Sequence, residues 1–206
     1  MPFRRCTHSF GDMSVVSETI NTAIPAMALE AYEILIDDAV HRGANAAGTE
    51  DTPARAAKAW KELTSGYAAN VDDIFKDFES NGYSGLVLQK NIEFFSLCEH
   101  HLLPFFGVAH VGYIPGKRIV GLSKLARIVD IYAKRLQTQE RITDQVADEL
   151  MNRLQPKGVG VVLEGTHLCM GMRGVNKFDA MTTTSALRGV ILMEPDARAE
   201  YMSLVR

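Results

Sequence analysis

The pattern of apolar positions indicates that the first part of the chain is helical. Residues 20–41 carry apolar side chains at helical spacing and predict a helix that follows Pro25. The segment 42–51 is rich in Gly, Ala and Asn and predicts a loop. A second helix is expected over 52–67 and a short third one over 70–78. About the first twenty residues show no such period, so we expect a flexible arm there.

From Gly85 onward the apolar pattern changes to that of a sheet with helices. β-branched and aromatic residues become frequent, which is typical of strands, and helical spacing returns between the strand pairs. The expected elements are strands 86–97 and 106–115, helices 123–136 and 140–154, strands 158–172 and 182–192, and a last helix over 196–206. Paired strands with segregated helices predict an α+β fold with a largely antiparallel sheet.

Composition and charge restrict the function classes. The chain has 206 residues, 47% of them hydrophobic, which is enough for one sizeable core. No apolar run approaches the roughly 18 residues that cross a bilayer, and no apolar segment follows the basic residues at the start. We therefore expect a cytoplasmic protein without a membrane partner. The net charge of −3 argues against a nucleic-acid binder but permits a small anionic ligand.

Between two hydrophobic runs stands a cluster of reactive side chains: Cys98, Glu99, His100 and His101. The whole chain holds only three cysteines and six histidines, so the cluster is unusual. A tight turn ahead of Pro104 would bring Cys98 and His101 together, because they are three positions apart. One loop commonly supplies two zinc ligands at such a spacing. Cys98 and His101 are therefore candidate metal ligands.

The third candidate ligand is Cys169. If 159–173 forms one strand, alternation places His167, Cys169 and Arg173 on the same face. Two cysteines and one histidine leave a fourth coordination position free, which is the pattern of catalytic zinc. His100 and His167 would then remain near the metal for acid–base work. The alternative is that both thiols are small buried apolar groups and the histidines have ordinary structural roles.

Two further segments could recognise a ligand. Gly121 and Ser123 precede a predicted helix that has Lys124 and Arg127 in its first turn, and a helix N-terminus suits phosphate. A solvated basic face is the alternative reading. Glu140 in turn either compensates the dipole of its helix or reads a hydrogen-bond donor edge on a ligand.

Several motifs resemble those of one family in order and character. These stretches are 97–115, 121–129, 135–143 and 167–175. They make the chain similar to type I GTP cyclohydrolase from about Thr52 to the last residue. The resemblance implies the tunnelling fold, a four-stranded antiparallel sheet with two helices packed on one side. It also implies a homo-oligomer, a decamer of two face-to-face pentamers with sites at subunit interfaces.

The resemblance implies a domain division and a reaction. Residues 81–206 would form the catalytic domain, and 1–80 the N-terminal arm and helical region. The substrate would be GTP, converted with water to 7,8-dihydroneopterin triphosphate and formate. One zinc per subunit, held by Cys98, His101 and Cys169, would activate the water that attacks C8 of the guanine.

The resemblance also implies roles for individual residues. The implied catalytic residues are His100 and His167 for proton transfer and Ser123 for the ribose rearrangement. The implied substrate-binding residues are Leu122, Ser123, Lys124, Arg127 and Arg173, Arg55 from a neighbouring subunit, and Gln139 and Glu140 for the guanine. The chain departs from the family pattern at Thr138, where a small aliphatic residue is usual, and at Ala180, where a serine is usual.

Two other functions are weighed against this one. A nitrile reductase of the 7-deazaguanine pathway has the same fold but needs a nicotinamide-binding segment, which we do not find. A non-catalytic, zinc-stabilised binding module would not need His100, His167 or a phosphate-directed basic set. The sequence thus favours catalysis, at the first step of pterin and folate or of 7-deazaguanine synthesis.

Overall fold

A computed structural model describes residues 16–206, with side chains from residue 26 onward. Its contacts divide the chain into two compact units, Met1–Glu62 and Leu63–Arg206. The catalytic-domain boundary that we expect between residues 80 and 81 stays a prediction. Nowhere in 16–206 does a helix combine the length and the apolar composition needed to cross a bilayer.

The N-terminal unit is helical, with α1 (Val16–His41), α2 (Ala46–Thr49) and α3 (Thr52–Leu63). The prediction that the first helix follows Pro25 is wrong, because α1 begins before this proline. Residues 1–15 of the predicted arm lie outside the described residues, and residues 16–20 belong to α1 instead. The predicted loop contains the short α2, since the Asn45 side chain accepts a hydrogen bond from the Gly48 N–H and caps a turn.

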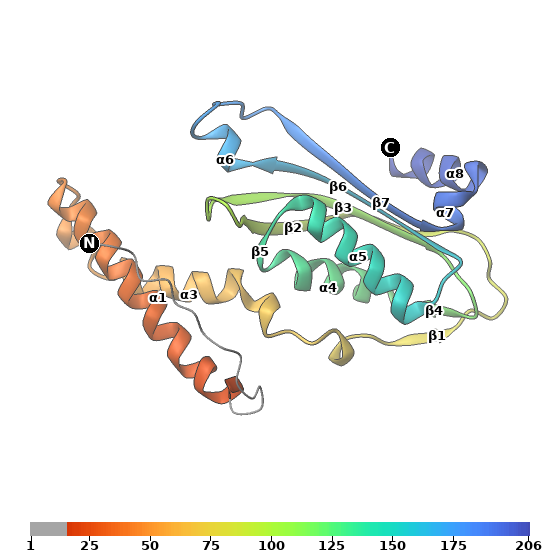
Figure 1. The fold of residues 1–206 in the computed structure, drawn as a ribbon, viewed down its shortest axis with the longest axis horizontal. Helices are drawn as coiled ribbons and strands as arrows, with labels where there is room; N and C mark the ends of the chain where they lie inside the picture. The colour runs from red at the N-terminus through yellow and green to blue at the C-terminus, as the bar shows by residue number, and fades with distance from the viewer. Residues whose placement is uncertain (1–15) are drawn as a thin grey trace, which may run out of the picture. The chain divides into compact units, whose positions relative to one another are not determined.

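The second unit is built on an antiparallel sheet of four long strands, β2 (Val87–Cys98), β3 (Pro104–Ile114), β6 (Gly158–His167) and β7 (Met181–Gly189). They lie side by side in the order β2-β3-β6-β7 (Figure 1). The two-residue β5 (Leu136–Gln137) extends the sheet by pairing in parallel with the end of β2. The expected four-stranded antiparallel sheet is confirmed, with β5 as an addition.

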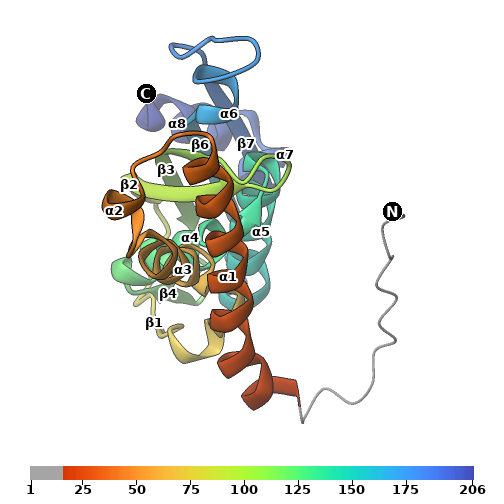
Figure 2. The ribbon, with the colours of Figure 1, turned by 90° about the vertical axis from the view of Figure 1, so that its left-hand side faces the viewer.

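Two helices cover one face of this sheet, α4 (Leu122–Ala133) and α5 (Gln139–Leu154), as Figures 1 and 2 show. Alternate strand residues such as Phe105 and Val161 point to these helices and are fully buried. Apolar residues of both helices at helical spacing, such as Leu125 and Val146, complete the core. The predicted α+β architecture with two helices on one side is therefore confirmed.

The connection that leads into the sheet differs from the prediction. A third helix was expected over 70–78, but the chain forms only 3₁₀ turns, η1 (Ser65–Tyr67) and η2 (Val71–Asp73). It then enters β1 (Asp77–Glu79), which pairs with β4 (Arg118–Val120) in a separate two-stranded sheet. Pairing with a distant segment thus overrides the local helical pattern.

The opposite face of the sheet is covered at one end by α7 (Val190–Met193) and α8 (Pro195–Val205). Tyr201 of α8 is 0% exposed, and its hydroxyl donates to the carbonyl oxygen of His110 at 3.0 Å. Its ring lies over two glycines of neighbouring strands, Gly112 and Gly160. A Cβ added to Gly160 would come within 2.6 Å of this ring. Because these two glycines have no side chains, the Tyr201 ring can pack directly on the sheet and hold α8 in place.

Replacement of Tyr201 by alanine is expected to lower the free energy of unfolding by about 3–5 kcal/mol, the usual cost of removing a buried aromatic side chain. Tyr201→Phe keeps the ring and removes only the hydrogen bond to His110, so it should cost about 1 kcal/mol. Urea unfolding of both variants measures the difference. Equal losses would mean that the hydroxyl, and not the ring, anchors α8.

Candidate active site

The cysteine–histidine cluster lies in the turn between β2 and β3. The N–H groups of His101 and Leu102 both donate to the carbonyl oxygen of Cys98, at 3.2 and 2.8 Å. Leu102 adopts the left-handed conformation, with a φ of 55°, which closes the turn. The side chains of Cys98 and His101 are thereby brought together, with 3.6 Å between Sγ and Nδ1. The predicted tight turn is confirmed.

Cys169 reaches this turn by a different route from the one predicted. The strand expected over 158–172 ends at His167, and Cys169 lies in the short helix α6 (Leu168–Gly171). The alternation argument for 159–173 is therefore wrong. Cys169 arrives beside the turn because β6 pairs with β3, with His167 opposite Phe105 at the start of β3. The ligand atoms of Cys98, His101 and Cys169 all lie within 4.8 Å of one another.

The spacing of Cys98 and His101 fits a tetrahedral zinc ion. Zn–S bonds of about 2.3 Å and Zn–N bonds of about 2.1 Å at tetrahedral angles put sulfur and nitrogen about 3.6 Å apart. The distance between Cys98 Sγ and His101 Nδ1 is 3.6 Å. Burial raises the pKa of the Cys169 thiol, and the neighbouring Cys98 raises it further. A bound dication would offset both effects, because it favours the thiolate forms.

Two more imidazoles border the candidate metal ligands. His167 stacks on Phe105 with 4.6 Å between ring centroids, and its Nε2 lies 2.9 Å from Gln139 Oε1. Burial lowers the pKa of His167, and the carboxylate of Glu140 opposes this in part. His100 has a side chain that is 65% exposed, with its Nδ1 3.9 Å from Cys98 Sγ. One imidazole is thus held within the protein, and the other faces outward.

An ion pair links the turn between β2 and β3, called the metal turn below, to the first turn of α5. Arg141 donates to the Glu99 carboxylate through two nitrogens, at 2.5 and 2.9 Å, and these hydrogen bonds lower the pKa of Glu99. The Glu99 N–H also donates to the carbonyl oxygen of Gln137 at 3.1 Å. The turn and the start of α5 are therefore held together. Sequence reasoning gave no role to Arg141, which is 42 residues from its partner.

The start of α5 accounts for one departure from the family pattern. Thr138 is the N-cap of this helix, and its side chain accepts a hydrogen bond from the Arg141 N–H. A small aliphatic residue could not make this bond. Glu140 is exposed in the first turn of the helix, whereas Gln139 is only 1% exposed. The two residues that were expected to contact the same base therefore have different surroundings.

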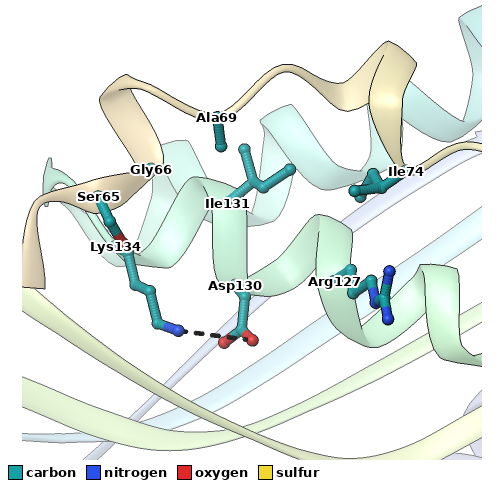
Figure 3. A pocket seen from close by; sticks show the side chains of 8 residues that line it. All are labelled: Ser65, Gly66, Ala69, Ile74, Arg127, Asp130, Ile131 and Lys134. Atoms are coloured by element: carbon teal, nitrogen blue, oxygen red, sulfur yellow. Dashed lines mark ion pairs between the residues drawn. The ribbon is translucent and has the colours of Figure 1, made fainter. Parts of the chain in front are cut away.

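The candidate phosphate-binding residues lie at the start of α4. Gly121 is the N-cap of this helix, and the next two residues, Leu122 and Ser123, are exposed. Arg127 lines a pocket of about 200 Å³ that also contains an ion pair of 3.7 Å between Lys134 and Asp130 (Figure 3). Its apolar wall and remaining lining are formed by Ser65, Gly66, Ala69, Ile74 and Ile131.

The two remaining predicted arginines are exposed. Arg173 follows α6 in an exposed segment. Its positive charge opposes in part the rise in the pKa of Cys169 that burial and Cys98 cause. Arg55 lies on α3 in the N-terminal unit, where it pairs with Asp51 at 2.8 Å. The structure thus brings the three candidate metal ligands together, with His100 beside Cys98 and His167 at the start of the helix that holds Cys169. It gives Arg55 a partner within its own helical unit.

Comparison with known proteins agrees with this arrangement. A profile of the family described as GTP cyclohydrolase I matches residues 29–206. GTP cyclohydrolase 1 of Deinococcus radiodurans is 56% identical over 161 residues, which cover 77% of this chain and 74% of that protein. The protein of the same name from Campylobacter jejuni subsp. jejuni serotype O:6 is 54% identical over 163 residues, 78% of this chain and 85% of that one.

A third relative matches almost the full length. GTP cyclohydrolase 1 of Synechococcus sp. (strain JA-3-3Ab) is 46% identical over 204 residues, which cover 98% of this chain and 87% of that protein. The profile match and the alignment with this third relative extend over the sheet, both covering helices and the cysteine–histidine cluster. The chain therefore belongs to the GTP cyclohydrolase I family of enzymes.

Proposed function

We propose that this protein converts GTP and water to 7,8-dihydroneopterin triphosphate and formate, with one zinc ion held by Cys98, His101 and Cys169. The observation that carries the proposal is the approach of these three ligand atoms to within 4.8 Å. Two further imidazoles flank the set, since His100 lies 3.9 Å from Cys98 Sγ and His167 is the N-cap of the helix that holds Cys169. Three protein ligands are the number found in catalytic zinc sites, whereas structural sites use four. Zinc bound there would supply Lewis-acid activation of the water that attacks C8 of the guanine.

The two imidazoles would move protons. His167, stacked on Phe105 and hydrogen-bonded to Gln139, has a fixed ring and a pKa lowered by burial. A neutral imidazole can accept a proton near pH 7 and return it later in the reaction. His100 lies on the exposed side of the cluster, where it can exchange protons with solvent. These positions support different roles for the two histidines when the five-membered ring of the guanine is opened.

The triphosphate would bind at the start of α4. This helix has twelve residues, and its N-terminal end offers N–H groups and a favourable dipole to an anion. The residues we assign to the triphosphate are Leu122, Ser123, Lys124, Arg127 and Arg173, with Arg55 from a neighbouring subunit. Ser123 would also assist the ribose rearrangement that follows ring opening.

The guanine would be recognised at the start of α5. Glu140 is exposed in the first turn, so its carboxylate is free to accept two hydrogen bonds from one base edge. The family resemblance predicts the same role for Gln139, but its side chain is buried and hydrogen-bonded within the protein. We therefore assign base selection to Glu140 and keep Gln139 beside it as a residue of the site.

The test of this function is incubation of the zinc-loaded protein with GTP. We expect release of formate and, after oxidation, a fluorescent pterin in equal amount. ATP under the same conditions should give neither product. Absence of formate from protein that contains one zinc per chain would overturn the proposal. We place the reaction in the cytoplasm, at the first step of pterin and folate or of 7-deazaguanine synthesis.

We also propose that the active form is a homo-oligomer, because Arg55 is assigned to the site of a neighbouring subunit. The family resemblance supports a decamer of two pentamers. Arg55→Ala and His167→Ala chains should each be inactive alone. Unfolded together and reassembled, they should regain part of the activity, since some sites then receive both intact residues.

The matched control is a mixture of His167→Ala with Cys169→Ala, two changes on the same side of the proposed site, which should not recover. Mass measurement must verify that the chains have mixed. Mixed oligomers of Arg55→Ala and His167→Ala that stay inactive would contradict the assignment of Arg55 to a second subunit.

A further inference from the structure

The side chain of Gln139 is held by two strands of the sheet. Its amide nitrogen lies within hydrogen-bond distance of three acceptors, the carbonyl oxygens of Leu163 and Thr182 and the hydroxyl oxygen of Thr184, at 3.1, 2.9 and 3.1 Å. The residue is 1% exposed. Two protons are thus shared among three acceptors, and the nitrogen end of the amide is fully used.

These acceptors allow only one orientation of the amide group. If it were rotated by half a turn, its oxygen would face two backbone carbonyl oxygens, with no proton between them. The amide oxygen must therefore point the other way, where His167 Nε2 lies 2.9 Å distant. The oxygen also lies against Gly165, where an added Cβ would come within 2.5 Å of it. The absence of a side chain at Gly165 provides the space that this orientation requires.

Two threonine hydroxyls reinforce the arrangement. The hydroxyl of Thr143 donates its single proton to the main-chain carbonyl oxygen of Gln139 at 2.7 Å. The hydroxyl of Thr184 lies 2.7 Å from that of Thr143, so Thr184 must be the donor of this pair. Thr184 in turn accepts from the Gln139 amide nitrogen. The two hydroxyls thus connect the main-chain oxygen of Gln139 to its side-chain amide, and both hydroxyl protons have an assigned acceptor.

We propose that Gln139 is a positioning residue that fixes the tautomer and the rotation of the His167 ring. An amide oxygen can only accept, so Nε2 of His167 must carry the proton and a neutral ring keeps its lone pair on Nδ1. The parallel stack on Phe105, with 4° between the ring planes, fixes the tilt of the same ring. The orientation and the tautomer of this ring are thus both set by neighbouring side chains of the protein.

This inference deepens the proposed function, because it concerns the histidine to which we assign proton transfer. Gln139 and Glu140 then have different proposed roles: Glu140 contacts the base, and the Gln139 side chain acts through His167. His100 offers an internal comparison, since its side chain is 65% exposed and lies on the outer side of the cluster.

The first test reads the tautomer without any substrate. Zinc-loaded protein labelled with ¹⁵N-histidine is examined by solid-state NMR, and the His167 signals are assigned by their loss in His167→Ala. We expect a single population protonated at Nε2. Gln139→Met, which keeps the volume but has no amide, should give a mixture of tautomers, while the His100 signals stay unchanged.

Thr184→Val is the matched control. It removes one partner of Gln139 but leaves the two backbone carbonyls that orient the amide, so the Nε2-protonated population should persist. A wild-type ring protonated at Nδ1 would overturn the proposal, as would an unchanged tautomer in folded, zinc-loaded Gln139→Met. Equal disturbance by Thr184→Val and Gln139→Met would also overturn it, since the effect would then be one of packing.

The second test uses GTP turnover and a double-mutant cycle. Gln139→Met should lower kcat by about tenfold to a hundredfold and change KM by less than about twofold. In the His167→Ala background the same change should have almost no further effect, because its partner is already gone. A raised KM and an additive loss would show instead that Gln139 contacts the substrate directly. If no variant or wild type turns over GTP, the NMR result still decides the positioning role.

Discussion

Cys169→Ala is expected to reduce the zinc content from one ion per chain to nearly none and to lower GTP turnover by about a thousandfold or more. Two remaining protein ligands cannot hold the ion that three hold, and loss of Lewis-acid activation removes several kcal/mol of transition-state stabilisation. Metal analysis after gel filtration, together with the formate assay, measures both effects. Chelation of the unmodified protein should give the same loss, and added zinc should reverse it.

Cys6→Ala provides the control, since Cys6 is the one other cysteine of the sequence and is not among the proposed ligands. It should retain both zinc and activity. Full zinc occupancy in Cys169→Ala would exclude Cys169 as a ligand, whatever happened to turnover. Loss of the folded state, monitored by circular dichroism, would identify the metal as structural instead of catalytic.

Glu140→Gln is expected to impair GTP turnover severely without changing zinc content or oligomer size. Guanine presents N1–H and the 2-amino group side by side, and an ionised carboxylate accepts both, whereas an amide offers a single acceptor. Adenine lacks both donors, and a site built to bind such donors can reject the analogue by about 10⁴. ATP should therefore not be turned over by the unmodified protein.

Asp144→Asn makes the same carboxylate-to-amide change one turn further along α5, on an exposed residue that pairs with Arg188. Its turnover should stay within about twofold of the unmodified protein, as expected for a surface substitution. Near-normal kinetics of Glu140→Gln would return Glu140 to the simpler role of a carboxylate at a helix start, worth about 0.3–1 kcal/mol of stability.

The strands and the metal turn were predictable because their determinants are local. Alternating apolar residues located β2 and β3, and the three-residue spacing of Cys98 and His101 led to the turn. The end of β6 was not predictable in this way. The pattern of alternate residues continues past His167, but the strand ends where its partner β3 begins, opposite Phe105. Only the pairing of two distant segments determines that point.

The roles of Gln139 and Arg141, which hold site residues in place by hydrogen bonds, could not be predicted from the sequence for a related reason. Gln139 stands next to Glu140 at a helix start, and nothing in its neighbours indicates that one side chain is buried and the other exposed. Its acceptors come from β6 and β7, and those of Arg141 from the turn after β2. Hydrogen bonds between residues tens of positions apart have no sequence period, so such roles emerge only once the sheet is assembled.

The close packing of the Tyr201 ring on two glycines has a consequence for evolution. Gly160 has no room for a Cβ beneath the aromatic ring, and Gly112 on the next strand is nearly as constrained. A mutation of Gly160 to alanine would therefore be harmful alone but tolerable after Tyr201 had become smaller. Positions 160 and 201 should accordingly change together across descendants of a common ancestor, although neither is part of the chemistry. Lineages with alanine at 160 and tyrosine at 201 should be rare.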